Sequence, residues 1–192
     1  PGGADYVERQ KGILRTRFDN TREFLVAGMM LGACDILVSG ENWIPVFTGG
    51  TFTIDQQVPA GNKNQVSASI SSTWDNTTNA KVFEDVLAVD NFFWQQTGYP
   101  LKHIWLNAVV WGYVTNNAGI RARAGSSNVV FTRFDGLGRT NNTEKTDEEY
   151  TAELRCLPGI QWHIYNGGLE LNGVFTKFFG DTRAIFIPEP SP

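Results

Sequence analysis

A long amphipathic helix is predicted near the start of the chain. The pattern there predicts a helix from Asp5 to about Leu31, ended by Gly32. Its large apolar residues recur at spacings near three, four and seven, namely Ile13, Leu14, Phe18, Leu25 and Met29. Charged side chains fill the other face. Such a helix is roughly 40 Å long at the usual rise per residue. We therefore expect it to lie across a surface or along a neighbour.

Two short strands and a polar stretch are predicted after this helix. Apolar residues favour strands at Cys34–Val38 and Thr51–Ile54. The turn signals between them are Gly40, Pro45 and the pair Gly49-Gly50. From Asp55 to Asn79 the composition shifts to Asn, Gln, Ser, Thr and Gly, which indicates an extended connector. We expect this stretch to separate two domains. The first domain is residues 1–60, the connector is residues 61–78, and the second domain is residues 79–192.

The clearest helix is predicted over Thr78–Thr97. Asn and Thr residues at 76–79 offer N-caps, and Gly98 stands where a C-terminal glycine is expected. The apolar stripe of this helix consists of Val82, Phe83, Val86, Leu87, Phe93 and Trp94.

A strand and a further helix follow. The pattern predicts a short strand over His103–Leu106. Asn107 is then predicted to cap a helix over Ala108–Thr115. Helix, strand and helix in quick succession are typical of an α/β unit.

The last third of the chain is predicted to be rich in strands. Thr146-Asp147-Glu148-Glu149 has the form of a capping box and predicts a helix to about Leu154. The predicted strands are Val129–Phe134, Ile160–Tyr165, Gly173–Phe179 and Arg183–Ile187. The whole pattern predicts an α+β fold.

Composition narrows the class of protein. Hydrophobic residues make up 41% and charged residues 19%, as in ordinary globular proteins. The net charge of -4 argues against a generic nucleic-acid-binding surface, but not against a protein that encloses nucleic acid without gripping it. No run approaches the roughly 20 apolar residues that span a bilayer. The opening residues Pro1-Gly2-Gly3 suggest a piece of something longer.

The residues that could carry chemistry form no recognisable site. We interpret His103 and His163 as isolated residues, each a surface or a hydrogen-bonded structural histidine. We interpret Cys34 and Cys156 as free buried thiols rather than a disulfide. A zinc site needs three or four ligands at recognisable spacing, which two His and two Cys do not supply. We therefore predict no metal or cofactor.

The acidic residues also have structural explanations. Glu84 and Asp85 diverge by about 100° on a helix and are not expected to act as an acid/base pair. Asp147 to Glu149 fit a first helical turn, and Asp55 fits a turn. We interpret Phe134–Arg139 as a loop, and no nucleophile elbow, phosphate loop or dinucleotide fingerprint is present. The chain is therefore not predicted to be an enzyme.

Two features leave alternatives open. The basic segment Gly119–Gly125 is either a solvated loop or a contact for acidic side chains of a partner. Aromatic residues make up 12% of the chain, and exposed Trp43, Trp74 or Trp162 would suit a ligand- or carbohydrate-binding module.

The order of motifs along nearly the whole chain resembles one viral family. The matching segments are Tyr6-Val7-Glu8-Arg9-Gln10, Leu31-Gly32, Thr53-Ile54-Asp55, Trp74, Ala80, Glu84-Asp85, Gly98-Tyr99-Pro100, Asn107-Ala108-Val109-Val110-Trp111, Leu157-Pro158-Gly159-Ile160, Trp162-His163-Ile164-Tyr165 and Ile185-Phe186-Ile187-Pro188. In this order they resemble the major capsid protein E family of tailed bacteriophages, the lambda-type coat proteins. The closing segments are the most specific part of the match.

The resemblance implies a Hong Kong 97-type capsid fold. Residues 5–55 would hold a long spine helix and part of a peripheral-domain sheet, and residues from about 75 to 192 an α/β axial domain. The implied role is structural: copies form hexamers and pentamers of a phage head, assembled in the host cytoplasm. Decoration, scaffold or portal proteins are implied partners, DNA is enclosed without specific binding, and no membrane is involved. The family's N-terminal arm would precede residue 1 and its final strands would follow Pro192.

Overall fold

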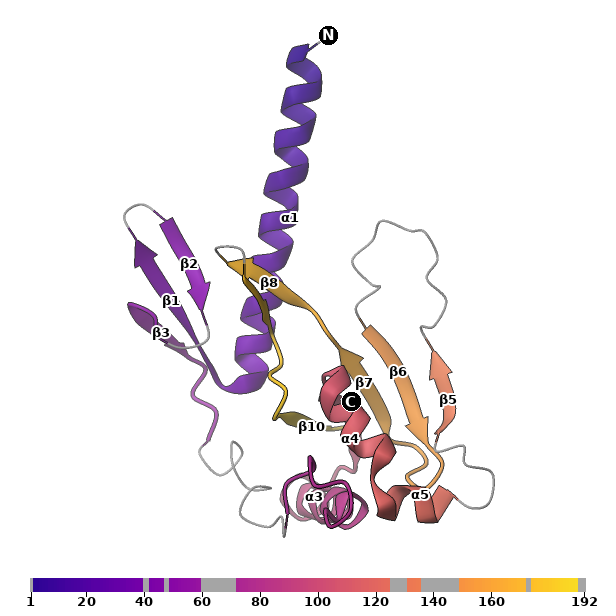
Figure 1. The fold of residues 1–192 in the computed structure, drawn as a ribbon. Helices are drawn as coiled ribbons and strands as arrows, with labels where there is room; N and C mark the ends of the chain where they lie inside the picture. The colour runs from indigo at the N-terminus through magenta and orange to yellow at the C-terminus, as the bar shows by residue number, and fades with distance from the viewer. Residues whose placement is uncertain are drawn as a thin grey trace. The chain divides into compact units, whose positions relative to one another are not determined.

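The chain folds into two compact units, each built from helices and strands (Figure 1). The computed structural model describes residues 2–39, 42–46, 49–59, 72–124, 131–135, 149–171 and 174–189. The first unit combines Pro1–Lys63 with Gly168–Phe178, and the second combines Asn64–Gly167 with Phe179–Pro192. The α+β prediction is confirmed. The return of the segment from Gly168 to the first unit was not predicted.

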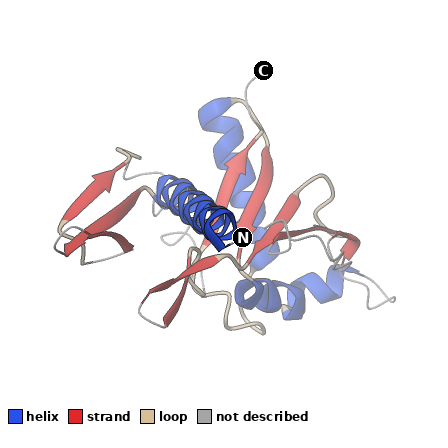
Figure 2. Ribbon diagram, turned by 90° about the horizontal axis from the view of Figure 1, so that it is seen from above, coloured by secondary structure: helices blue, strands red, loops and turns tan. Residues whose placement is uncertain are grey.

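Helix α1 opens the first unit, and Figure 2 shows it nearly end-on. It runs over Gly2–Leu31, slightly earlier than the predicted start at Asp5. Gly32 ends it as predicted, with a φ of 92° and an N–H that donates to the Met29 carbonyl. Glycine adopts this left-handed backbone without the steric cost of a Cβ.

A three-stranded antiparallel sheet follows α1, with strand order β2-β1-β3. Strands β1 (Ala33–Ser39) and β3 (Phe52–Asp55) confirm the two predicted strands. Strand β2 (Asn42–Val46) was missed because we interpreted Pro45 as a turn residue. Pro45 instead pairs with Ile36 of β1. An edge strand tolerates proline because one of its sides makes no ladder hydrogen bonds.

The hairpin of β8 (Gly168–Leu171) and β9 (Val174–Lys177) completes the first unit. Strand β8 was not predicted, and β9 is shorter than the predicted strand Gly173–Phe179. Phe178 after the hairpin is buried and packs on Phe24 of α1, with ring centroids 6.3 Å apart. This aromatic pair ties the hairpin to the helix.

The second unit is organised around a five-stranded sheet with the order β10-β4-β7-β6-β5. Strands β4 and β7 are parallel, whereas the other neighbours are antiparallel. The strands span β4 Leu101–Leu106, β5 Phe131–Asp135, β6 Glu149–Leu154, β7 Gln161–Tyr165 and β10 Ala184–Pro188. Four of these strands were predicted. Strands β4, β5, β7 and β10 correspond in order to the predicted strands His103–Leu106, Val129–Phe134, Ile160–Tyr165 and Arg183–Ile187.

Strand β6 corrects a prediction. The capping-box pattern predicted a helix from Thr146 to about Leu154, but Glu149–Leu154 is a strand, and Thr146 to Glu148 lie outside the described residues. Ala152 and Leu154 are buried, whereas Thr151 and Glu153, which alternate with them, are partly exposed, and this is the two-residue period of a strand. Pairing with β5 and β7 on both sides decides this conformation over the local capping signal.

Helix α3 (Val82–Thr97) confirms the clearest predicted helix, with one correction at its start. Its N-cap is Lys81 and makes no side-chain capping bond, although residues 76–79 were predicted to supply the cap. Asn76 instead closes a turn, because its side-chain oxygen accepts from the Asn79 N–H at 3.2 Å. The C-terminal end is as predicted, since Gly98 has a φ of 76° and donates to the Trp94 carbonyl.

Two asparagines cap the next two helices. Asn107 caps α4 (Ala108–Asn116) as predicted, and its Oδ1 accepts from the backbone N–H groups of Val109 and Val110. Asn117 precedes α5 (Ala118–Ala124) in the same way and accepts from the Ile120 N–H. Both asparagines are fully buried, so each cap belongs to the core as well as to its helix.

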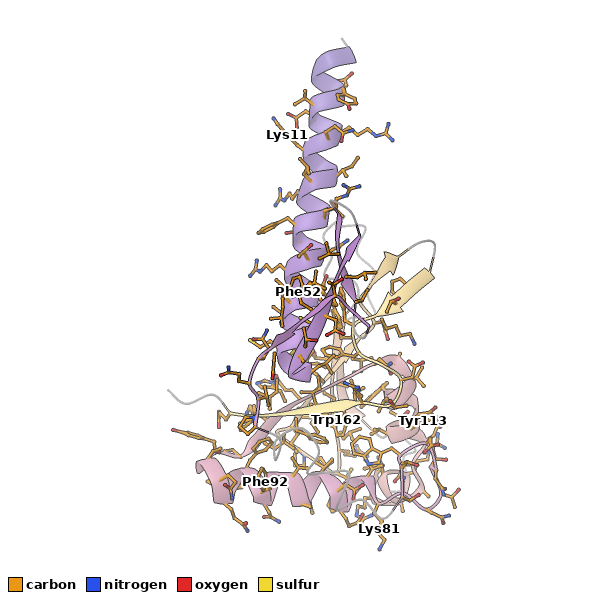
Figure 3. The ribbon with its side chains drawn as sticks, turned by 90° about the vertical axis from the view of Figure 1, so that its left-hand side faces the viewer. Lys11, Phe52, Lys81, Phe92, Tyr113 and Trp162 are labelled. Atoms are coloured by element: carbon orange, nitrogen blue, oxygen red, sulfur yellow. The ribbon has the colours of Figure 1, made fainter. Side chains whose placement is uncertain are left out.

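The core of the second unit lies between one face of the sheet and the three helices. Trp162 of β7, labelled in Figure 3, is completely buried there beside Trp111 of α4. Further core residues are Val82, Val86, Ile104, Leu106, Val114, Ile120, Leu154 and Ile164. The alternation predicted for β7 is confirmed, because Ile160, Trp162 and Ile164 are buried. Within the described residues no helix is long and apolar enough to cross a bilayer.

Candidate functional site

The two histidines, interpreted as isolated, are neighbours in the fold. Strands β4 and β7 are paired in parallel, and this brings the Nδ1 of His103 to 3.0 Å from the Nε2 of His163. Both rings lie on the sheet face opposite the helices and are partly exposed. Of the two roles predicted for these residues, surface or hydrogen-bonded structural histidine, the second is confirmed, but their isolation is wrong. No local pattern signals this pairing, because 60 residues separate the two positions along the chain.

His163 has an aromatic neighbour on the same face. Its ring stacks on that of Trp105, with centroids 4.3 Å apart and planes only 3° from parallel. Tyr165 and Phe179 contact the edge of this group. The outer face of the sheet thus carries an aromatic cluster built from β4, β7 and the residue before the final turn.

The two cysteines are free thiols, as predicted. Cys34 is buried at the start of β1, and Cys156 is partly buried in the turn after β6. Burial raises the pKa of both thiols. A thiol kept protonated in this way is a poor nucleophile.

The adjacent carboxylates Glu84 and Asp85 diverge, as predicted. Glu84 accepts from Arg123 of α5 at 2.6 Å. Asp85 is buried and accepts from the indole N–H of Trp74 at 2.9 Å. Burial raises the pKa of Asp85, and the hydrogen bond from Trp74 opposes that shift only in part. Each carboxylate is therefore occupied by a different structural partner.

In the first unit, Asp35 is a polar anchor that sequence reasoning missed. Its two carboxylate oxygens accept from the Thr53 hydroxyl at 2.6 Å and the Gly50 N–H at 3.1 Å. The Thr53 and Gly50 bonds hold the pKa of Asp35 below its usual range. Asp55 accepts from the N–H of Gln57, which fits the predicted turn role. Both carboxylates thus accept hydrogen bonds from groups of the first unit.

The basic segment is a helix, which corrects its interpretation as a loop. Arg121 and Arg123 lie on α5, and Gly125 is outside the described residues. Arg121 donates to the Asn116 side chain and the Thr115 carbonyl. Arg123 pairs with Glu84 and lies 4.2 Å from the centroid of the Phe83 ring. The acidic partner of Arg123 thus comes from its own chain.

The tryptophans proposed for ligand binding are mostly engaged in the core. Trp162 is fully buried, whereas Trp74 packs edge-on against Phe186 and donates to Asp85. Trp43 lies in β2, and its side chain is outside the described part of the structure. These contacts give no support to a carbohydrate-binding module.

The described residues hold no group of three or more His, Cys, Asp or Glu that suits a metal ion. Asp147, Glu148 and most of the predicted loop Phe134–Arg139 lie outside the described ranges, and Phe134 and Asp135 belong to β5. Within the described ranges, the candidate side chains named from the sequence come together only as structural pairs.

The most distinctive surface is an apolar stripe along α1. At about 100° per residue its members lie within about 60° of one another around the helix axis. The stripe consists of Val7, Leu14, Phe18, Leu25 and Met29, with exposed fractions of 50%, 63%, 69%, 37% and 53%. Figure 3 shows side chains projecting to both sides of α1 near Lys11 in that view. The helix buries a different side, through Phe24 and Ala27.

Comparison with known protein families assigns the chain to a family of structural proteins. A model of the family described as phage major capsid protein E matches residues 3–192. No curated protein matches the chain. Because the match covers nearly every residue, it includes both units as well as the segments that outline the resemblance. The chain therefore belongs to the phage major capsid protein E family, and its role is that of a structural protein of the bacteriophage head.

Proposed function

We propose that this chain forms the phage shell by packing against copies of itself, with the α1 stripe as one of its subunit contacts. The supporting observation is the stripe itself. Leu14 and Phe18 are 63% and 69% exposed on a helix of 30 residues. Contiguous exposed apolar surface of this kind marks protein–protein contact. Family membership supplies the kind of partner, which is a second copy of the subunit.

The two units take the two roles that the family resemblance implies. In this proposal the first unit, with α1 and the three-stranded sheet, is part of the peripheral domain. The second unit is the axial domain, whose copies meet in hexamers and pentamers. Contacts to decoration, scaffold or portal proteins and assembly in the host cytoplasm belong to the same proposal. The mildly acidic chain encloses DNA without binding it specifically, and itself carries out no catalytic step.

Electron microscopy of the full-length natural protein tests the shell role directly. We expect closed shells or capsomers after expression. Persistent monomers under every assembly condition would contradict the proposal that copies of this chain form the shell.

Two substitutions test the stripe separately. Leu14→Glu and Phe18→Glu place a charge in the contact, and we expect the yield of shells to fall at least tenfold while the helix content stays unchanged. Thr16→Glu is the matched control, because Thr16 is exposed on the opposite side of the same helix and the added charge is equal. If the stripe variants assemble like the control, the stripe is not a contact, although the shell role stands.

A further inference from the structure

The pair of histidines on the outer face of the five-stranded sheet has a property that neither residue has alone. We propose that His103 and His163 form a single-proton site that joins β4 to β7: one added proton strengthens the pair, and a second breaks it. The proposal rests on the geometry of the second unit and does not depend on the capsid role.

The distance between the two ring nitrogens limits how many protons the pair can carry while its hydrogen bond persists. At 3.0 Å, one ring nitrogen carries a hydrogen and the other accepts it. A single added proton leaves an N–H facing a bare nitrogen and makes the bond charge-assisted. A second proton places hydrogens on both nitrogens and like charges in contact, so the bond is lost. Two groups coupled in this way release their protons in separate macroscopic steps.

The surroundings of His103 disfavour the first proton on its own ring. The ring of His163 lies flat on Trp105, a geometry in which an aromatic face attracts a cation. Burial, and next the neighbouring His163, lower the pKa of His103. The Nε2–H of a charged His163 then donates to the Nδ1 of a neutral His103.

The two charged side chains that act on His103 besides the partner ring have opposite effects. Lys102 on β4 lowers the pKa of His103, and Glu189 after β10 raises it. On β6, Thr151 pairs with His163 and Glu153 with Gln161, and the Glu153 carboxylate accepts from the Gly159 N–H. The partner ring therefore remains the largest charge-dependent influence on His103 after burial.

The position of the pair gives the second proton a structural consequence. β4 and β7 form the parallel junction of a sheet whose other described neighbours are antiparallel. Because the folded-state pKa of His103 is depressed, its neutral form contributes stability that is present above the ordinary histidine value of about 6.5 and is lost as the pH falls toward the depressed value. Acid is therefore expected to loosen this junction.

Imidazole nitrogen NMR on the 192-residue chain tests the proposal from pH 8 to 4, with EDTA present. The chain has only two histidines, so every imidazole signal comes from the pair. We expect two steps at least one pH unit apart, a tenfold difference in proton affinity. Between them Nε2 of His163 is protonated and Nδ1 of His103 is not. Amide protection in β4 and β7 persists through the first step and falls in the second.

Two variants separate coupling from general acid sensitivity. In His163→Gln the amide can still donate to His103 without a charge, and we expect His103 to titrate at higher pH than the second step of the natural chain. Lys102→Gln is the control, and it should move the steps without merging them. A single joint step in the natural chain, or a titration that changes when EDTA is omitted, overturns the proposal. The titration of the natural chain tests the proposal even if a variant fails to fold.

Discussion

Gly28 of helix α1 lies directly against Cys34 of strand β1. A Cβ built on Gly28 would stand 2.6 Å from the Cβ and 2.8 Å from the Sγ of Cys34. Such distances are far inside van der Waals contact, so a side chain at position 28 would have to push the strand away. The absence of a side chain at Gly28 therefore lets the end of the helix approach the sheet of the first unit.

Gly28→Ala is expected to destabilise the first unit. Overpacking costs about 1–3 kcal/mol, and the better helix propensity of alanine returns at most about 1 kcal/mol. We expect a net loss of about 1–2 kcal/mol in the free energy of unfolding, measured by urea denaturation followed by circular dichroism.

Gly12→Ala is the matched control on the same helix. Nothing lies within 4 Å of a Cβ built there, so only the propensity gain remains. The control should be stabilised by up to about 1 kcal/mol. Equal behaviour of the two variants would show that the contact with Cys34 does not restrict position 28.

Asn107→Ala is expected to be among the more damaging substitutions in the second unit. The side chain caps α4 through Oδ1, and its Nδ2 donates to the Phe179 carbonyl at 3.1 Å and to the Asp181 carboxylate at 2.6 Å. Loss of the cap and of a buried donor should lower the free energy of unfolding by about 2–4 kcal/mol. Thermal and urea unfolding measure this loss.

Asn116→Ala provides the comparison for Asn107. Asn116 is exposed, donates to the Gly112 carbonyl and accepts from Arg121. Its removal should change the free energy of unfolding by less than about 1 kcal/mol because water replaces its partners. A loss as large as that of Asn107→Ala would contradict the role assigned to the buried cap.

Asp85→Asn is expected to stabilise the second unit at neutral pH. Burial raises the pKa of Asp85, so the folded protein holds its proton to higher pH than the unfolded chain does. The ionised carboxylate therefore costs stability as the pH rises above about 3.9, the ordinary aspartate value. Asparagine can still accept from Trp74 and carries no charge to desolvate.

Unfolding curves at several pH values check this expectation. The stability advantage of Asp85→Asn should be present at pH 7 and shrink toward pH 4, where the natural aspartate is protonated. Trp74→Phe tests the hydrogen bond separately and should destabilise, because it leaves the buried carboxylate without its donor. An Asp85→Asn variant that is less stable at pH 7 than at pH 4, relative to the natural chain, would reverse the assigned sign.

The elements that could be predicted from the sequence are those whose signals are local. Helix α1 ends at the predicted glycine, Asn107 caps α4, and β7 buries the predicted alternate residues. Each of these depends on residues within a few positions of one another, so spacing alone reveals them. The order of such motifs along the chain also pointed to the family. The family model, which matches residues 3–192, confirms that identification.

Features that depend on distant partners could not be predicted and become visible only in the folded chain. Strand β6 overrides a capping box because β5 and β7 pair with it on both sides, and Pro45 lies in a strand because that strand is at a sheet edge. His103 and His163 meet only because β4 and β7 are neighbours. Such pairings depend on the order of strands in the sheet, which brings together residues far apart along the chain. The local sequence around each residue therefore contains no pattern that indicates its partner.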